Sequence, residues 1–347
     1  MAAQSGRRPR VAVLGVGAVG GCVAAVLEHA GHCDVTLVAR GATLAALVEN
    51  GLTVHMFDED APPFTCHPRC VSVDDTASAG EQDFVLLCTK AHQLPPLVDK
   101  LLPLFGEHTV LVPVMNGIPF WHSFGLRGVT DAPVLAVDPG GRLHAELGAA
   151  RAIGCVVRVG GSVLAPGIIK MAGNQPALEF GEPDGRLDSP RLCDLMGLFA
   201  DEAPDKPIDF LVSEKPVIRN GVWDKLVFNV VGNSLQTLTQ ATAGDLVGDP
   251  ALLQVCRGMV AEMFTIGAAI GIEFTVTIKQ MVEGFNKFSS AKASTLQDLE
   301  AGRPFEKDAI MTAVQQIAAE AGVSIPLIDM AAALLAGLER NAVLSKL

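Results

Sequence analysis

The chain has 347 residues, which is a length that predicts two domains, and 49% of them are hydrophobic, enough to form folded cores. Its formal net charge of −12 argues against nucleic acid or an anionic membrane surface as a partner, because both repel acidic proteins. No apolar run reaches the roughly 18 uninterrupted residues of a membrane-spanning helix, so we expect no membrane segment.

The amino terminus carries basic residues but lacks the apolar stretch of a signal peptide. We therefore expect residues 1–9 to form a disordered tail. The eight cysteines are scattered, and several lie in apolar segments where a free thiol behaves as a small hydrophobe, so we expect a cytoplasmic, reduced protein. Cys66 and Cys70 flank a His-Pro-Arg sequence but lack a second ligand pair at a recognised spacing, and we predict no metal site.

Short apolar runs alternate with helical patterns in the first half of the chain. This alternation predicts a parallel sheet covered by helices on both faces. The expected helices are Ala18–Ala30 and Gly41–Asn50, and the expected strands are Val11–Leu14, Asp34–Ala39, Phe84–Cys88, Val110–Pro113 and Val134–Ala136.

A strand-rich stretch follows, and then the pattern becomes helical from Val217 onward. The stretch is interrupted by glycine and proline pairs, which favours an antiparallel extension with strands at Ala152–Val159, Gly167–Ala172 and Ala177–Gly181. A strand-like segment at Ile208–Val212 marks the junction. We therefore predict an α/β domain over residues 10–214 and an all-α domain over residues 215–347.

A glycine-rich turn joins the first strand to the first helix. Gly15 permits a tight turn, Gly17 lets the backbone approach a pyrophosphate, and Gly20 lets the helix pack closely on the strand. The free N–H groups of the helix then face the phosphates. This predicts a Rossmann-type dinucleotide-binding domain with a cofactor-binding turn made of Gly15, Val16, Gly17, Ala18, Val19 and Gly20.

The end of the second strand predicts which cofactor is bound. No acidic residue occurs between Asp34 and Glu49 to accept from the ribose hydroxyls of NAD, whereas Arg40 can grip the extra 2′-phosphate of NADP. Arg40 could also be a solvated surface residue. Lys90 and Gln93 follow the strand Phe84–Cys88, at the sheet edge where ligands bind in such folds. Asn116, in an Asn-Gly pair after the next strand, could be a ligand contact or only part of a turn.

The clearest chemical pattern lies in the helical half. Lys225, Asn229 and Asn233 fall at four-residue spacing, on one side of a helix whose other residues are mostly apolar. Such a row could simply face water, but asparagine is a poor helix former and would be an unusual choice for an exposed face. An ammonium can protonate the oxygen of a ketone that receives a hydride, and amides can donate to a substrate's oxygen atoms.

Two further polar residues follow. Ser294 could donate to a substrate carboxylate or begin the expected helix Thr295–Ala301 as a cap. Glu306 could bind a ligand or only favour the dipole of the next helix. We expect His92 and His122 to be structural or exposed groups.

Taken together, these motifs resemble the ketopantoate reductase (2-dehydropantoate 2-reductase) family from Val11 to about Pro326. Each motif alone is unspecific, but their order and spacing are specific. The resemblance rests on Gly15–Gly20, Cys88–Gln93, Asn116-Gly117, Trp223–Asn233, and Ser294–Asp298 followed by Glu306.

The resemblance implies a role for each matching residue. Lys225 matches the general acid, and the residues that hold the hydroxy acid match Asn116, Asn229, Asn233 and Ser294. Asn116 matches a family residue that lies near both the nicotinamide ribose and the substrate. The cofactor-side residues match Lys90, Gln93 and Glu306, together with Gly160 as the small residue beside the nicotinamide.

The chain departs from the family pattern at several positions. Ala291 stands where some members carry an asparagine, and Ala243 or Gly244 falls where some carry another amide. The segment Ile118–His122, which contains Trp121, is bulkier than expected. The strand Ala152–Val159 is apolar where some members have hydroxyl side chains. These departures leave Lys225 intact but put the acyl group of the substrate in doubt.

We therefore hypothesise hydride transfer from NADPH to 2-dehydropantoate, or to a closely related 2-oxo acid, in a cleft between the domains, with pantoate as the product. The alternatives are another NAD(P)-dependent hydroxy-acid or opine-type dehydrogenase, and a non-catalytic NADPH sensor. Apolar positions such as Met330–Leu338 suggest a possible homodimer through the helical domain.

Overall fold

The computed structural model describes residues 7–126, 129–200, 210–287 and 292–344. The chain divides into two compact units, one made of Met1–Met115 and Arg142–Ile218, the other of Asn116–Gly141 and Arg219–Leu347. Residues 116–141, which we expected in the first domain, thus belong to the helical unit. Within that unit, the backbone N–H of Ile118 donates to the carbonyl of Ala309 at 2.8 Å.

Five parallel strands form the main sheet of the first unit, in the order β5-β2-β1-β6-β7. Its strands are β1 (Arg10–Leu14), β2 (Asp34–Ala39), β5 (Arg69–Ser72), β6 (Gln82–Leu87) and β7 (Phe105–Pro113). The associated helices are α1 (Ala18–Ala30), α2 (Gly41–Asn50) and α3 (Val98–Leu101). Because the strand order reverses beside β1, the carboxyl ends of β1 and β6 lie at a switch point, where open α/β sheets bind ligands. The predicted α/β fold is confirmed.

A second sheet belongs to the same unit, with the order β10-β9-β3-β4 and with β8 antiparallel to β9. Its strands are β3 (Leu52–His55), β4 (Phe64–Cys66), β8 (Gly154–Ala165), β9 (Ile168–Gly181) and β10 (Leu211–Glu214). Helix α1 contacts strands of both sheets, so its residues Gly20–Leu27 are all buried. Gly21 permits this, since a Cβ there would lie 2.7 Å from the Cδ1 of Ile169.

Two predictions of strands were wrong, and the last residues of the expected tail contact the fold. The two strands expected at Gly167–Ala172 and Ala177–Gly181 form the single strand β9. Val134–Ala136 is not a strand, because the N–H groups of Val137 and Asp138 fold back onto the carbonyl of Val134 in a turn. Arg7, which we expected in a disordered tail, contacts the fold, because its guanidinium bonds both carboxylate oxygens of Asp83 at 2.7 Å.

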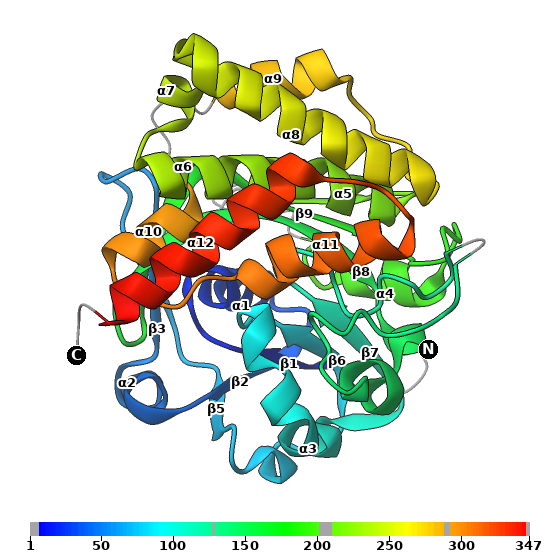
Figure 1. Cartoon of the computed structure of the whole chain (residues 1–347). Coiled ribbons are helices and arrows are strands. Elements are labelled where there is room, and N and C mark those ends of the chain that lie inside the picture. Colours follow the sequence, from blue (N-terminus) through cyan, green and yellow to red (C-terminus); the bar gives the residue numbers. More distant parts are fainter. Residues whose placement is uncertain (1–6, 127–128, 201–209, 288–291, 345–347) are drawn as a thin grey trace. The chain divides into compact units, whose positions relative to one another are not determined.

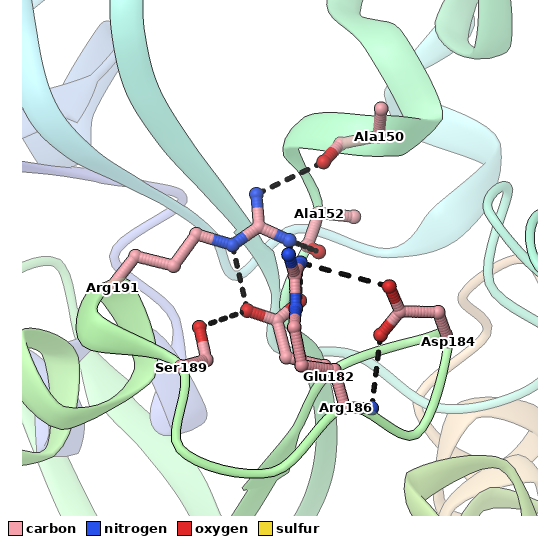
Figure 2. Close-up of polar contacts among 7 residues, drawn as sticks. All are labelled: Ala150, Ala152, Glu182, Asp184, Arg186, Ser189 and Arg191. Atoms are coloured by element: carbon pink, nitrogen blue, oxygen red, sulfur yellow. Dashed lines mark hydrogen bonds and ion pairs between the residues drawn. The ribbon is translucent and has the colours of Figure 1, made fainter.

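A buried carboxylate joins the end of β9 to α4 (Pro190–Gly197) (Figure 2). Glu182 is 2% exposed and accepts from Arg191 Nε at 2.8 Å and from a terminal nitrogen of Arg191 at 2.5 Å. Ser189 Oγ also donates to it, and Arg186 lies 3.6 Å away. The other donors of Arg191 bond the carbonyls of Ala150 and Ala152, at 2.9 and 3.1 Å. Glu182 thus ties the end of β9 to α4, and Arg191 ties α4 to the segment that leads into β8.

The second unit is helical in its described part. Its helices are α5 (Ile218–Phe228), α6 (Ser234–Thr239), α7 (Ala243–Gly248), α8 (Pro250–Ala269), α9 (Ile278–Lys287), α10 (Ser294–Glu300), α11 (Ala313–Glu320) and α12 (Pro326–Leu344). In Figure 1, α7, α8 and α9 pack together, and α12 lies along α6. Among the described residues, α8 alone is long and apolar enough to cross a membrane by length and composition. Core helices of folded domains meet the same criterion, and α8 contacts α7, α9 and α12.

Candidate functional site

The glycine-rich turn between β1 and α1 is shaped by contact with the end of β6. Gly15 has a φ of +89°, a conformation that side chains disfavour, and a Cβ there would lie 2.6 Å from Thr89 Cγ2. A Cβ at Gly20 would lie 2.1 Å from the carbonyl oxygen of Gly15. Gly17 differs, because nothing lies within 4 Å of a Cβ built there. The turn therefore leaves open space at the one glycine where a pyrophosphate would approach the backbone, which fits a dinucleotide.

The other predicted cofactor residues of the first unit are at strand ends or on a strand. Arg40 is exposed, directly after β2, and immediately precedes α2. Lys90 and Gln93 are half-buried in the turn after β6, where the N–H of Gln93 donates to the carbonyl of Lys90 at 2.9 Å. Gly160 is exposed on β8 and pairs with Ala172 of β9. The chain thus offers a glycine turn, two cations and an amide to a phosphorylated cofactor.

Lys225 and Asn116 are joined directly within the second unit. The ammonium of Lys225, on α5, donates to Oδ1 of Asn116 at 2.7 Å. The two residues are 109 positions apart in sequence. An amide oxygen beside the ammonium fixes its direction without neutralising its charge. This geometry suits a group that must deliver a proton to a defined point.

The next residues of the row bury amide nitrogens that have no partner. A π-helical turn at Asn229–Asn233 connects α5 to α6, and turns of this kind are frequent at functional sites. Among the described residues, no group bonds Nδ2 of Asn229, Nδ2 of Asn233 or Oγ1 of Thr237. Buried donors are nearly always satisfied in folded proteins, because leaving one unpaired costs about 1–3 kcal/mol. The orphaned amides are therefore suited to donate to a ligand.

Ser294 and Glu306 have different surroundings. Ser294 is exposed as the first residue of α10, and the N-cap position before it is occupied by Ala293. Glu306 is half-buried and lines a small cavity together with Asn233 and Thr295. Two of the predicted residues, Asn233 and Glu306, thus face one space. Ala291 lies outside the described residues.

Two polar residues beside the predicted site were missed by the sequence analysis. Thr89, which contacts the glycine turn, buries an Oγ1 without a partner in the described part of the chain. His122, which we set aside as structural or exposed, is 2% exposed, and its Nε2 accepts from Trp223 Nε1 at 3.0 Å. Thr89 lies inside the Cys88–Gln93 motif, which is the signal in the sequence that points to it. His122 belongs to no motif that the sequence makes visible.

Metal chemistry finds no support in the part of the chain that the structure covers. The described residues contain no group of three or more histidine, cysteine or acidic side chains that could hold an ion. The thiols of Cys66 and Cys70 instead hydrogen-bond the backbone carbonyls of Leu52 and Pro68.

Comparison with known proteins yields two matches to family models. Residues 11–185 match the model described as ketopantoate reductase PanE/ApbA, and residues 217–339 match its C-terminal counterpart. A 2-dehydropantoate 2-reductase of Mesorhizobium japonicum is 35% identical over 327 residues, which cover 94% of this chain and 96% of that protein.

Solved structures agree with these matches. A structure described as a ketopantoate reductase of Ralstonia solanacearum MolK2 has a TM-score of 0.86 at 32% identity, with 97% of this chain and 99% of that chain covered. A D-mandelate dehydrogenase solved with NADH and anilino(oxo)acetate has the same fold, with a TM-score of 0.77 at 18% identity, covering 96% of this chain and 99% of that chain. With both family models and a relative above 30% identity spanning nearly its whole length, the chain belongs to the ketopantoate reductase family.

Proposed function

We propose that the chain reduces 2-dehydropantoate, or a closely related 2-oxo acid, to the 2-hydroxy acid pantoate with NADPH as the reductant. The observation that carries the proposal is the hydrogen bond between Lys225 and Asn116 in a family whose curated relative acts on 2-dehydropantoate. The charge developing on the ketone oxygen during reduction needs a proton, and an oriented ammonium is the group in this unit suited to supply it.

Each remaining residue has a task in this chemistry. When bound, NADPH supplies the hydride, and the residues that would hold it are Gly15–Gly20, Arg40, Lys90, Gln93, Gly160 and Glu306. Arg40 would pair with the 2′-phosphate, which is the group that separates NADPH from NADH. Asn229 and Asn233 would donate their orphaned N–H groups to the substrate's oxygen atoms. Ser294 would bind the carboxylate, and Asn116 would hold the Lys225 ammonium toward the ketone.

The test is NADPH oxidation by the purified protein with a panel of 2-oxo acids. We expect 2-dehydropantoate to react fastest, and we expect the rate to be higher with NADPH than with NADH. Lys225→Ala should lower kcat by about 10²- to 10⁴-fold, the usual contribution of a general acid, without weakening NADPH binding in a fluorescence titration. Lys279→Ala is the matched control, because that side chain is 84% exposed.

Two results would count against the proposal in different ways. Near-normal turnover by Lys225→Ala would remove the proton donor from the mechanism. A clear preference for phenylglyoxylate, the oxidised partner of mandelate, would move the substrate toward that of the structurally similar D-mandelate dehydrogenase while leaving Lys225 in place. If no 2-oxo acid is turned over although NADPH binds tightly, the result would favour the alternative that the protein is a non-catalytic NADPH sensor.

We also propose that the protein is a cytoplasmic homodimer formed through the helical unit. Met330 and Leu334, four residues apart on α12, are 52% and 53% exposed, and a partner would cover them. A structurally similar ketopantoate reductase from Staphylococcus aureus is described as dimeric. Every described cysteine is a free thiol, in keeping with a reducing compartment.

A further inference from the structure

The chain that follows Asn116 runs beside α5 and is fastened to it at several points. We call residues 117–124 the α5-flanking segment. Its first half is fixed by Ala309, whose carbonyl accepts from Ile118 N–H at 2.8 Å, and a Cβ at Gly117 would lie 2.5 Å from that same oxygen. Its second half is held by Arg219, which donates to the carbonyls of His122 at 3.0 Å and Phe124 at 2.6 Å.

One side-chain hydrogen bond completes this attachment. Trp223 Nε1 donates to His122 Nε2 at 3.0 Å, and both side chains are buried, with exposures of 0% and 2%. An indole N–H can only donate, so Nε2 must be the unprotonated nitrogen of the imidazole. Burial, helped by the charge of Arg219, lowers the pKa of His122 to about 3. The imidazole therefore stays a neutral acceptor at any pH used for an assay.

Two hydrogen bonds thus connect the same two pieces of chain. At one end Asn116 accepts from Lys225, and at the other His122 accepts from Trp223. Trp223 and Lys225 are two residues apart on α5. Asn116 and His122 are six residues apart on the stretch of chain that faces α5. A shift of the flanking segment along α5 would therefore change both bonds together. Because the Lys225–Asn116 bond is 2.7 Å long, a small shift is enough to lose it.

We propose that His122, through its hydrogen bond to Trp223, positions Asn116 against the Lys225 ammonium, and that it does so without touching the substrate. His122 is then a positioning residue for the reduction. This inference rests on the proposed function, since it gives Lys225 a catalytic task. Nothing in the family resemblance assigns a role to His122.

The experiment compares variants that keep or remove the acceptor, with kcat measured per folded enzyme. His122→Leu removes it, and His122→Gln returns an oxygen near the position of Nε2. We expect His122→Leu to lower kcat about tenfold, in line with the cost of misplacing a catalytic group, and His122→Gln to restore most of it. Trp223→Phe, which removes the donor instead, should match His122→Leu, and the double variant should be no worse than either single one.

The chain offers a matched control for the tryptophan variant. Trp121 is buried to the same degree as Trp223, at 1% exposure, but in the described part of the chain its Nε1 has no hydrogen-bond partner. Trp121→Phe makes the same chemical change without breaking a hydrogen bond. It also keeps an aromatic ring beside the Arg219 guanidinium, which lies 5.5 Å from the centre of the Trp121 ring, so we expect near-wild-type kcat. If His122→Leu does not yield folded protein, the Trp223→Phe and Trp121→Phe pair carries the same comparison.

The same substitutions made in a second variant, Asn116→Ala, show whether His122 positions Asn116 or only supports the fold. In Asn116→Ala the bond to Lys225 is already lost, so adding His122→Leu or Trp223→Phe should change kcat by less than about twofold. An equal loss of kcat in both backgrounds would overturn the proposal, as would a folded His122→Leu or Trp223→Phe enzyme with unchanged kcat. Failure of the proposed function looks different, because turnover would then survive Lys225→Ala itself.

Discussion

Buried polar groups are treated in opposite ways in two regions of this molecule. In the first unit, Glu182 is enclosed, and both of its carboxylate oxygens accept hydrogen bonds, from Arg191 and Ser189. In the second unit, Asn229 and Asn233 bury amide nitrogens that no described group bonds. Groups that hold a fold together must be satisfied by the fold, whereas groups that wait for a ligand are satisfied only when it binds. The contrast therefore separates stability from function residue by residue.

The largest effect on stability is expected when the hydrogen-bonded cluster around Glu182 is broken. Arg191→Ala leaves the Glu182 carboxylate buried without its main partner, which should lower the free energy of unfolding by about 3 kcal/mol. Urea denaturation followed by circular dichroism measures this. The control is Arg186→Ala, because Arg186 lies 3.6 Å from Glu182 with its side chain 57% exposed, and its loss should cost less than about 1 kcal/mol. Equal effects of the two variants would mean that the cluster adds little to the fold.

The same cluster predicts a pH dependence. Burial alone would raise the pKa of Glu182, but hydrogen bonds from Arg191 and Ser189 and the nearby positive charges outweigh it, and the pKa is lowered. A lowered folded-state pKa gives stability that is fully present above the unfolded value, about 4.3 for glutamate, and is lost as pH falls through the folded value. In Arg191→Ala the burial of Glu182 is no longer offset by Arg191, so the folded-state pKa of its carboxyl rises and the variant regains stability when this group takes up a proton. The stability gap between wild type and Arg191→Ala should therefore narrow as pH falls, beginning above the unfolded value of about 4.3. A gap that persists unchanged into acid would contradict this account.

The sequence predicted the helices and strands next to the glycine-rich turn well. Helices α1 and α2 and strand β2 lie where the apolar runs and glycines put them, because turn chemistry marks both ends of each element. Strands β3 to β5 were missed, since segments such as Phe64–Cys66 are too short for alternation to be visible. Strand β9 was split in two because glycine and proline look like breaks, although both lie inside it.

The helical site was predicted as a set of residues but not as an arrangement. Lys225 and Asn116 were both identified, yet a bond across 109 residues follows from tertiary packing, which no local pattern encodes. The same holds for His122, whose partner Trp223 is 101 residues away. Local spacing predicted Asn229 and Asn233 on one side of a helix. Only the structure could show that their amide nitrogens are buried and unpaired.

The third prediction sharpens the comparison at the glycine turn. A Cβ at Gly17 meets no atom, and its φ of −88° suits any residue, so Gly17→Ala should leave the stability of the protein without ligand nearly unchanged. It should weaken NADPH binding by at least about tenfold, or 1.4 kcal/mol, because the methyl group occupies space meant for the pyrophosphate. Fluorescence titration and thermal unfolding give the two readouts.

Gly20→Ala is the contrasting variant. Its Cβ would lie 2.1 Å from the Gly15 carbonyl oxygen and 2.7 Å from Cys88 Cβ, so the turn itself must shift. We expect Gly20→Ala to lower both the unfolding temperature and NADPH affinity, where Gly17→Ala lowers affinity alone. Wild-type NADPH affinity in Gly17→Ala would show that the open space at this glycine is not where the cofactor binds.

The smallest expected effect is an increase in stability, which is an unusual result for a mutation and therefore tests the comparison most sharply. Asn233→Leu replaces an orphaned amide with an apolar group of similar size, so the free energy of unfolding should rise by up to about 1 kcal/mol. The KM for the 2-oxo acid should rise at the same time, because the unpaired Asn233 amide lowers stability but binds the substrate. Gln236→Leu is the matched control, since the Gln236 amide oxygen is buried but accepts from Ala293 N–H at 2.9 Å. That variant should lose stability, because it leaves a backbone donor unpaired. If Asn233→Leu were the destabilised one, the Asn233 amide would be part of the fold's own hydrogen bonding, and the distinction between the two regions would fail at the residue on which it most depends.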